Sequence, residues 1–78
     1  MDEFEKIRAI IADQMNISTD KITMETSFTK DLKADSLDIF QIISELEETF
    51  GMEFANEDAE KIVTVGDAVN YVRKALNH

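Results

Sequence analysis

Cysteine and proline are missing from this sequence of 78 residues, and only two glycines are present. The lack of cysteine excludes disulfide bonds, thiolate metal sites and a cysteine nucleophile. Without proline and with so little glycine, few positions are marked as sharp turns, which favours a helical chain. Long apolar runs are absent too. We therefore expect neither a signal peptide nor a membrane span, and the cytoplasm is the default compartment.

Positive charge is scarce, and its distribution along the chain is uneven. Seventeen Asp and Glu against eight Lys and Arg give a formal net charge of -9. Such a field repels nucleic acid, because neutralising phosphates requires Lys and Arg. Between Ala34 and Glu60 the chain has nine acidic residues and no Lys or Arg. Acid that served solubility alone would be spread evenly, whereas a block of one sign is suited to steering partners with basic patches.

Three long segments show apolar residues at helical spacing, and a short fourth segment begins like a helix. We expect helices over residues 2–15, 35–50, 56–62 and 64–76. The predicted N-terminal caps are Asp2, Asp35, Asn56 and Thr64, and the predicted C-terminal caps are Asn16 and Gly51. No segment shows strand alternation. The expected fold class is all-α, a small four-helix bundle with three main helices and one short one, in a single domain over residues 1–78.

The expected core is the apolar face of each main helix. Its residues are Phe4, Ile7, Ile11, Met15, Ile39, Ile42, Ile43, Leu46, Phe50, Val65, Ala68, Val69, Val72 and Leu76. The first loop, residues 17–34, is long for a compact domain. Ile22, Phe28 and Leu32 are spaced to pin it onto the core. Because the loop leads directly to Ser36, its length favours a functional role for that serine.

The helix predicted at 35–50 has an outer face that is mostly acidic or polar. That face carries Asp38, Gln41, Ser44, Glu45 and Glu48. Leu37 falls among these residues, and Phe40 lies at the border near Glu47. Acidic residues around one or two exposed apolar side chains are typical of a docking surface, since charge steers the encounter and the apolar residue anchors it.

The residues around Ser36 do not support a role for it as a catalytic nucleophile. A serine needs a base to accept its proton, and the only histidine is His78 at the end of the sequence. There is no Gly-x-Ser-x-Gly motif around Ser36 and no lysine three residues after it. The sequence therefore predicts that the protein is not an enzyme.

The sequence does not support a specific metal site either. Asp31, Asp35 and Asp38 superficially resemble a calcium-binding loop, but Lys33 occupies a ligand position and Ser36 occupies the position of the required glycine. We expect no specific metal site, only loose binding of divalent cations to the acidic block.

If Asp35 caps the helix, the Ser36 hydroxyl is left in the first turn, facing solvent. A phosphate there would lie beside unpaired backbone N–H groups and the positive end of the helix dipole. A capping serine or an ordinary phosphorylation site would have the same local sequence.

The segment Asp35-Ser36-Leu37-Asp38, followed by Glu45-Leu46-Glu47-Glu48 and Phe50, resembles the bacterial acyl carrier protein family. The resemblance spans almost the whole chain. It implies a stand-alone, monomeric carrier of dissociated fatty acid synthesis. It also implies that a phosphopantetheinyl transferase attaches 4'-phosphopantetheine from coenzyme A to Ser36. Fatty acyl chains would then travel as thioesters on the arm, sheltered in the core. Partner enzymes with basic patches would contact Asp35, Leu37, Asp38, Phe40, Gln41, Glu45, Glu47 and Glu48.

The sequence departs from the family pattern at several positions. Lys33 stands where glycine is common, Gln41 where an acid is common, Ser44 where an apolar residue is common, and Ala55 where proline is frequent, while Glu45 is an added acid. Partner preference could therefore differ from that of well-known relatives. Two alternatives stay open at this point: a carrier for polyketide or other acyl-transfer chemistry, and an unmodified acidic helical docking module.

Overall fold

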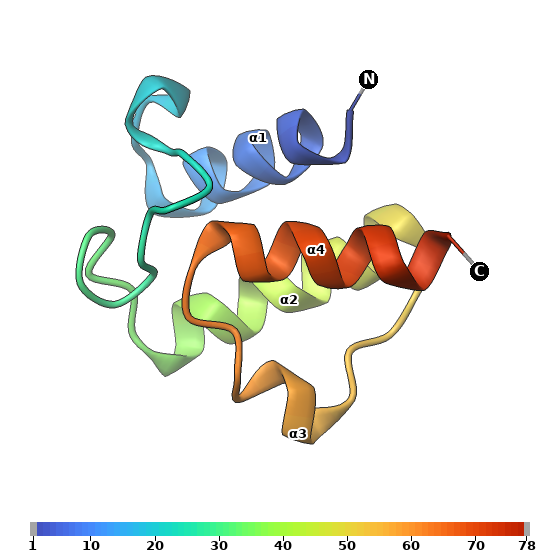
Figure 1. The fold of residues 1–78 in the computed structure, drawn as a ribbon. Helices are drawn as coiled ribbons and strands as arrows, with labels where there is room; N and C mark the ends of the chain where they lie inside the picture. The colour runs from blue at the N-terminus through green and yellow to red at the C-terminus, as the bar shows by residue number, and fades with distance from the viewer. Residues whose placement is uncertain (1, 78) are drawn as a thin grey trace.

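The structure, a computed structural model, describes residues 2–77, so that His78 lies outside the described residues. The elements, in order, are α1 (Glu3–Met15), the short 3₁₀ helix η1 (Thr19–Lys21), α2 (Ser36–Phe50), α3 (Asn56–Ala59) and α4 (Val65–Leu76). Within residues 2–77 the only extended pairing is an isolated antiparallel bridge between Ser27 and Thr64. The predicted all-α fold, with three main helices, one short helix and a long first loop, is confirmed (Figure 1).

The starts of α2 and α4 are fixed by side chains close to them in the sequence. Asp35 accepts a hydrogen bond from the Asp38 N–H at 2.9 Å, and the Asp38 carboxylate accepts one from the Asp35 N–H at 3.2 Å. Thr64 and Asp67 make the same reciprocal pair at the start of α4. Each pair satisfies two backbone donors that a helix start otherwise leaves free. Both predicted caps are confirmed.

The ends of α1 and α2 also follow the sequence. Asn16 at φ 57 and Gly51 at φ 63 adopt the left-handed conformation that lets each helix end. At the start of α1, Asp2 accepts from the Phe4 N–H. Glu5 pairs with Arg8 and does not complete a reciprocal cap.

The third helix begins at Asn56, as predicted, but its cap and its end were predicted wrongly. Ala55, not Asn56, is the N-cap of α3, because Ala55 keeps an extended backbone at φ -66 and ψ 144, and no side chain caps the helix. The helix stops at Ala59 and does not reach Ile62. Beyond Ala59 the backbone bonds tighten, as the Ile62 N–H donates to the Ala59 carbonyl at 3.2 Å. Such bonds, spanning three residues, are typical of a turn that ends a helix.

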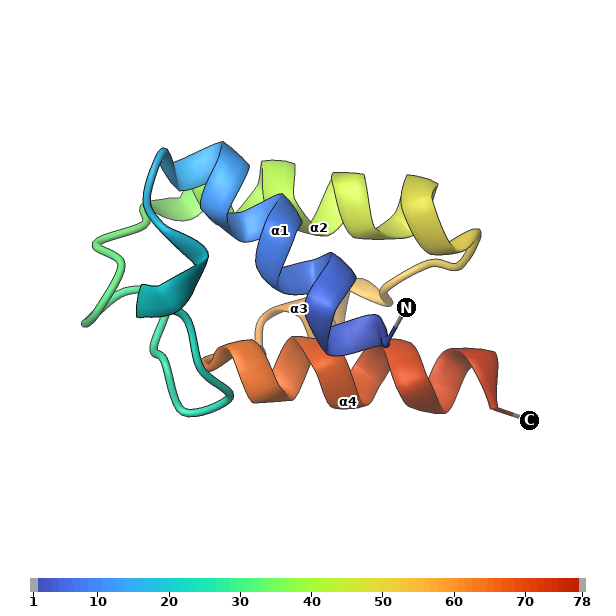
Figure 2. The same cartoon turned by 90° about the horizontal axis from the view of Figure 1, so that it is seen from above.

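Helices α1, α2 and α4 enclose the core, with α1 contacting both of the others and α2 contacting α4 (Figure 2). The fully buried large side chains are Phe28, Ile7, Ile11, Ile22, Ile42, Leu46, Val65, Val69 and Val72. Phe4, Met15, Leu32, Ile39 and Phe50, also expected in the core, pack against it half-buried. Leu76 was wrongly predicted as core and is 39% exposed. It lies in the last turn of α4, which extends past the first turn of α1 (Figure 2).

The long first loop is bound to the start of α4. The Phe28 N–H donates to the Val63 carbonyl at 3.0 Å, and the Val65 N–H donates to the Thr26 carbonyl at 2.9 Å. The Gly66 N–H donates to the Met24 carbonyl at 2.8 Å. A Cβ on residue 66 would lie only 2.8 Å from that same oxygen, so this approach requires glycine. Together with buried Ile22 and Phe28, these bonds anchor the loop to the core, as predicted.

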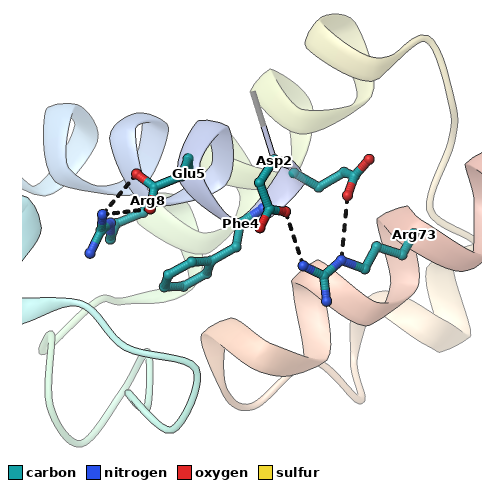
Figure 3. Close-up of polar contacts among 6 residues, drawn as sticks. Asp2, Phe4, Glu5, Arg8 and Arg73 are labelled. Atoms are coloured by element: carbon teal, nitrogen blue, oxygen red, sulfur yellow. Dashed lines mark hydrogen bonds and ion pairs between the residues drawn. The ribbon is translucent and has the colours of Figure 1, made fainter.

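An ion pair joins the start of α1 to α4 (Figure 3). Arg73 Nη2 lies 3.0 Å from Asp2 Oδ1, and Arg73 Nε lies 3.4 Å from Glu3 Oε1. The hydrogen bond from Arg73, followed by that from the Phe4 N–H, lowers the pKa of Asp2 below its ordinary value. These groups are solvent-exposed, so salt screens the interaction.

Candidate functional site

Ser36 is the first residue of α2 and is exposed. The capping role belongs to Asp35, as expected from the sequence. The Ser36 hydroxyl is therefore not needed to begin the helix, and it stands at the end of α2 where the helix dipole is positive. This position suits an attached anionic group, because the positive end of the dipole favours negative charge. The nearby Asp35 and Asp38 carboxylates accept hydrogen bonds from backbone N–H groups.

A pocket of about 550 Å³ lies beside Ser36, between α2 and the segment of α3. Most of its lining is apolar, and it also includes four polar residues. The apolar residues are Phe28, Ile39, Phe40, Ile43, Ala59, Ile62 and Val63, and the polar ones are Thr29, Ser36, Asn56 and Glu60. A pocket with mostly apolar walls and a few polar groups is typical of a site for a small apolar ligand.

Three strongly exposed apolar side chains lie at or near this pocket. Phe40 and Val63 line it, and Leu37 directly follows Ser36 in the sequence. Leu37 is 71% exposed, Phe40 is 70% exposed and Val63 is 56% exposed. The outward position predicted for Leu37 is confirmed. Phe40, predicted at the border of the outer face, is fully on the surface and lines the pocket. Large exposed apolar residues close to a polar residue such as Ser36 are typical of a contact surface.

The predicted docking residues differ in how free their side chains are. Glu45 and Glu48 are exposed. Gln41 is exposed and accepts a hydrogen bond from Gln14 of α1 at 2.9 Å. Glu47 is half-buried, and its Oε2 accepts from the Phe54 N–H at 2.8 Å.

Neither a metal cluster nor a membrane helix is found among the residues that the structure describes. No group of three or more His, Cys, Asp or Glu residues is placed to hold a metal ion within residues 2–77. Over the same range, every helix is too short or too polar to cross a bilayer.

Lys33, two residues before the cap of α2, has φ 58. This is the left-handed conformation, which costs a residue with a Cβ about 1–2 kcal/mol. The conformation explains why glycine is common at this position of the family pattern noted from the sequence. The chain turns here to bring Ala34 into the core and Ser36 to the surface.

Much of the pocket wall was not predicted from the sequence. Thr29, Glu60 and Val63 were given no role, and Asn56 was expected only as a cap. Val63 could have been recognised as a site residue, because it is an apolar residue just after a short acidic helix. Phe54 and Tyr71, which pack on each other, were also missed. Their pairing joins residues far apart in the chain and left no periodic pattern.

Comparisons with known proteins agree with this geometry. A family model described as phosphopantetheine attachment site matches residues 5–72. A solved structure of a candidate acyl carrier protein from Mycobacterium tuberculosis is 36% identical with a TM-score of 0.87, covering 92% of this chain and 96% of that chain. The acyl carrier protein from Enterococcus faecalis is 38% identical with a TM-score of 0.81, covering 96% of this chain and 99% of that chain. The chain therefore belongs to the acyl carrier proteins, non-catalytic carriers that hold their cargo on phosphopantetheine.

Proposed function

We propose that Ser36 is the residue that carries the phosphopantetheine arm and that the cargo is a fatty acyl chain. The observation that carries this proposal is the exposed Ser36 in the first turn of α2, bordering an apolar pocket of about 550 Å³. The arm supplies the thiol that this cysteine-free chain lacks. A chain bound to that thiol as a thioester could fold back into the pocket, out of water.

The attachment reaction follows from the chemistry of coenzyme A. A phosphopantetheinyl transferase joins the Ser36 oxygen to the phosphorus of the arm, and the hydroxyl proton is lost. The diphosphate bond of coenzyme A breaks, and its adenosine bisphosphate half leaves. The phosphodiester so formed lies at the positive end of α2, which favours its negative charge.

A fatty acyl cargo is favoured over a polyketide cargo by the pocket walls. Seven of the eleven lining residues are apolar, among them Ile39, Ile43 and Ile62, so most of the wall has no side chain that could hydrogen-bond to a ketone or hydroxyl midway along a chain. Burying such a group without a partner costs free energy, whereas burying methylene groups is favourable by about 0.8 kcal/mol each. We infer that saturated chains of fatty acid synthesis are the cargo and that the synthesis enzymes are the partners.

The partner surface proposed here is the outer face of α2 with its first turn. Its residues are Asp35, Leu37, Asp38, Phe40, Gln41, Glu45 and Glu48. Glu47 is set apart from them, because its carboxylate accepts a hydrogen bond from the Phe54 N–H. Acidic residues steer basic partners, and exposed Leu37 and Phe40 supply apolar anchors. The single domain, monomeric state and cytoplasmic location expected from the sequence stay predictions.

The attachment site is tested by intact mass after incubation with coenzyme A, magnesium and a transferase. We expect the protein to gain one arm, Ser36→Ala to gain none, and Ser44→Ala, which changes another exposed serine of α2, to gain one. An arm on Ser36→Ala would show that another residue carries it. Wild-type protein that stays bare would leave only an unmodified docking module.

The cargo is tested by loading the arm with acyl chains of equal length, one saturated and one bearing a mid-chain ketone. A ligand that binds the native state raises the melting temperature. We expect the saturated chain to raise it more. An equal or larger rise with the ketone chain would contradict the fatty acyl assignment and favour the polyketide alternative.

Docking is tested with Leu37→Ala. Because Leu37 is 71% exposed, we expect the melting temperature to change little while KM for the transferase rises. A large loss of stability in this variant would contradict a surface role.

A further inference from the structure

The connection between α2 and α3, residues 51–55, is held from two sides by side chains. The Phe54 N–H donates to Glu47 Oε2 at 2.8 Å, and the next N–H, that of Ala55, donates to the Tyr71 hydroxyl at 3.2 Å. Glu47 belongs to α2 and Tyr71 to α4. Two consecutive backbone donors that no helix satisfies are thus each satisfied by a different helix's side chain.

Tyr71 extends this attachment into α3. Its hydroxyl donates to Asp58 Oδ2 at 2.8 Å while accepting from Ala55, and its ring stacks on Phe54 at 4.5 Å between centroids and 13° between planes. Phe54 itself is only 7% exposed. The Ala55 N–H lowers the pKa of Tyr71, but the bond to Asp58, burial and the nearby carboxylates raise it above its ordinary value. The phenol therefore remains protonated and able to donate at neutral pH.

Helix α3 has little else to hold it in place. It contains no buried residue and lacks a side-chain cap, and in and just after it Ala59 and Ile62 are only half-buried. Yet Asn56, Ala59 and Glu60 form part of the pocket wall. The hydrogen bonds of Glu47 and Tyr71 therefore hold the segment that leads into a wall of the pocket.

We propose that Glu47 and Tyr71 form a clasp, defined as their bonds to Phe54, Ala55 and Asp58, that positions α3 as the wall of the pocket. Glu47 is then a positioning residue and not a partner contact, unlike exposed Glu45 and Glu48 on the same helix. The effect of the clasp on cargo rests on the function proposed above. That the clasp exists in the unmodified protein does not depend on the proposed function.

The first test is amide hydrogen exchange of the unmodified protein by NMR, with variants that separate the acceptor from its charge. Glu47→Ala removes the acceptor, whereas Glu47→Gln keeps a carbonyl oxygen and loses the charge. We expect Glu47→Ala to speed exchange at Phe54 by about tenfold or more, since a part-buried donor is then left without its acceptor. Glu47→Gln should remain close to wild type, and Glu48→Ala, the matched control, should change nothing. Equal acceleration by both Glu47 variants, or by neither, would overturn the clasp.

Tyr71→Phe provides a second variant that keeps the stack on Phe54 and loses both bonds of the hydroxyl. We expect faster exchange at Ala55 and throughout α3, with little change in the amides of α1. Unchanged exchange in α3 would mean that Tyr71 does not position it.

The docking half of the proposal is tested by the rate at which the transferase loads the variants. A positioning role predicts that Glu47→Gln loads like wild type, while Glu48→Gln loads more slowly because a surface charge is lost. If Glu47→Gln is slowed as much as Glu48→Gln, Glu47 contacts partners through its charge, and that half is wrong. Failure of wild-type protein to be loaded would refute the proposed function, and the exchange experiment would still decide the clasp.

The cargo half is tested on protein loaded with saturated chains of increasing length. The rise in melting temperature per added carbon should be smaller in Tyr71→Phe than in wild type, because a looser α3 encloses the chain less well. Equal rises would show that the clasp does not shape the pocket.

Discussion

The α1–α4 side and the α2–α3 side of the bundle are held together by different means. On the first side, Ile7 and Ile11 of α1 and Val69 and Val72 of α4 are fully buried, and Arg73 adds an ion pair. On the second, α3 has no buried residue and depends on hydrogen bonds from side chains. The pocket lies on this second side. A firm three-helix frame can therefore stay folded while the weakly held wall yields to a guest.

The largest contrast is expected between truncation of the three-helix frame and truncation of the pocket wall. Leu46→Ala removes a fully buried side chain of the frame and should lower the free energy of unfolding by about 3 kcal/mol. Ile62→Ala, in the half-buried pocket wall, should lower it by only about 1 kcal/mol. Urea denaturation measures both values. Similar losses would mean that the wall is as tightly packed as the frame, and the comparison would fail.

The next contrast concerns how the helices begin. Thr64→Ala removes the side-chain cap of α4 and should cost about 1 kcal/mol of folding free energy. Asn56→Ala at the start of α3 should cost only a few tenths, about the level of an ordinary surface change, because no side chain caps that helix. The same denaturation series compares them. If Asn56→Ala cost as much folding free energy as Thr64→Ala, Asn56 would cap α3 after all, as predicted from the sequence.

A gain in stability is expected at Lys33, on the loop that leads to Ser36. Lys33→Gly relieves a left-handed conformation worth about 1–2 kcal/mol, offset by about 0.5–1 kcal/mol for the extra freedom of glycine when unfolded. The net gain should be about 0.5–1 kcal/mol. Lys30→Gly in the same loop, where φ is not positive, should not stabilise the protein. Equal effects of the two changes would argue against strain at Lys33.

The smallest change in folding stability is expected when the pH is lowered. The Thr64 N–H, then the Val63 N–H, lowers the pKa of Asp67. Because the native pKa lies below the unfolded value of about 3.9, this stabilisation is complete above that pH and is lost as the pH falls through the native pKa. Asp67→Asn should therefore reduce the loss of stability in acid, as measured by thermal melts across pH.

The pKa of Asp2 is also lowered, but the largest cause is the hydrogen bond from the Arg73 guanidinium, in an ion pair on the exposed surface. The effect of Asp2→Asn should shrink at molar salt, while that of Asp67→Asn should persist, since backbone hydrogen bonds are screened less than exposed ion pairs. If salt abolished both effects alike, the Asp67 contribution would be an exposed charge effect and not a cap.

Local chemistry explains what could be predicted from the sequence. The starts of α2 and α4 depend on residues three apart, and the ends of α1 and α2 depend on Asn16 and Gly51, so short motifs were enough. The outward position of Leu37 followed from helical periodicity. These features required no knowledge of distant parts of the chain.

Distant contacts explain what could not be predicted. Leu76 matched the apolar period of α4, but nothing in its own helix indicated that the last turn extends beyond α1. Glu47 matched the pattern of a surface acid, although its carboxylate turns to the Phe54 N–H seven residues later. The pocket wall and the Phe54–Tyr71 stack likewise depend on which segments fold next to each other.

The backbone hydrogen bonds that join Met24, Thr26 and Phe28 to residues 63–66 have a consequence for biosynthesis. The segment leading to Ser36 can take its final shape only after residues 63–66 have been translated, because its backbone partners do not exist before then. In a nascent chain that ends before residue 63, Ser36 would follow a loop that is not yet hydrogen-bonded to the rest of the fold. A transferase that recognises the folded shape would thus modify finished carriers and pass over incomplete ones.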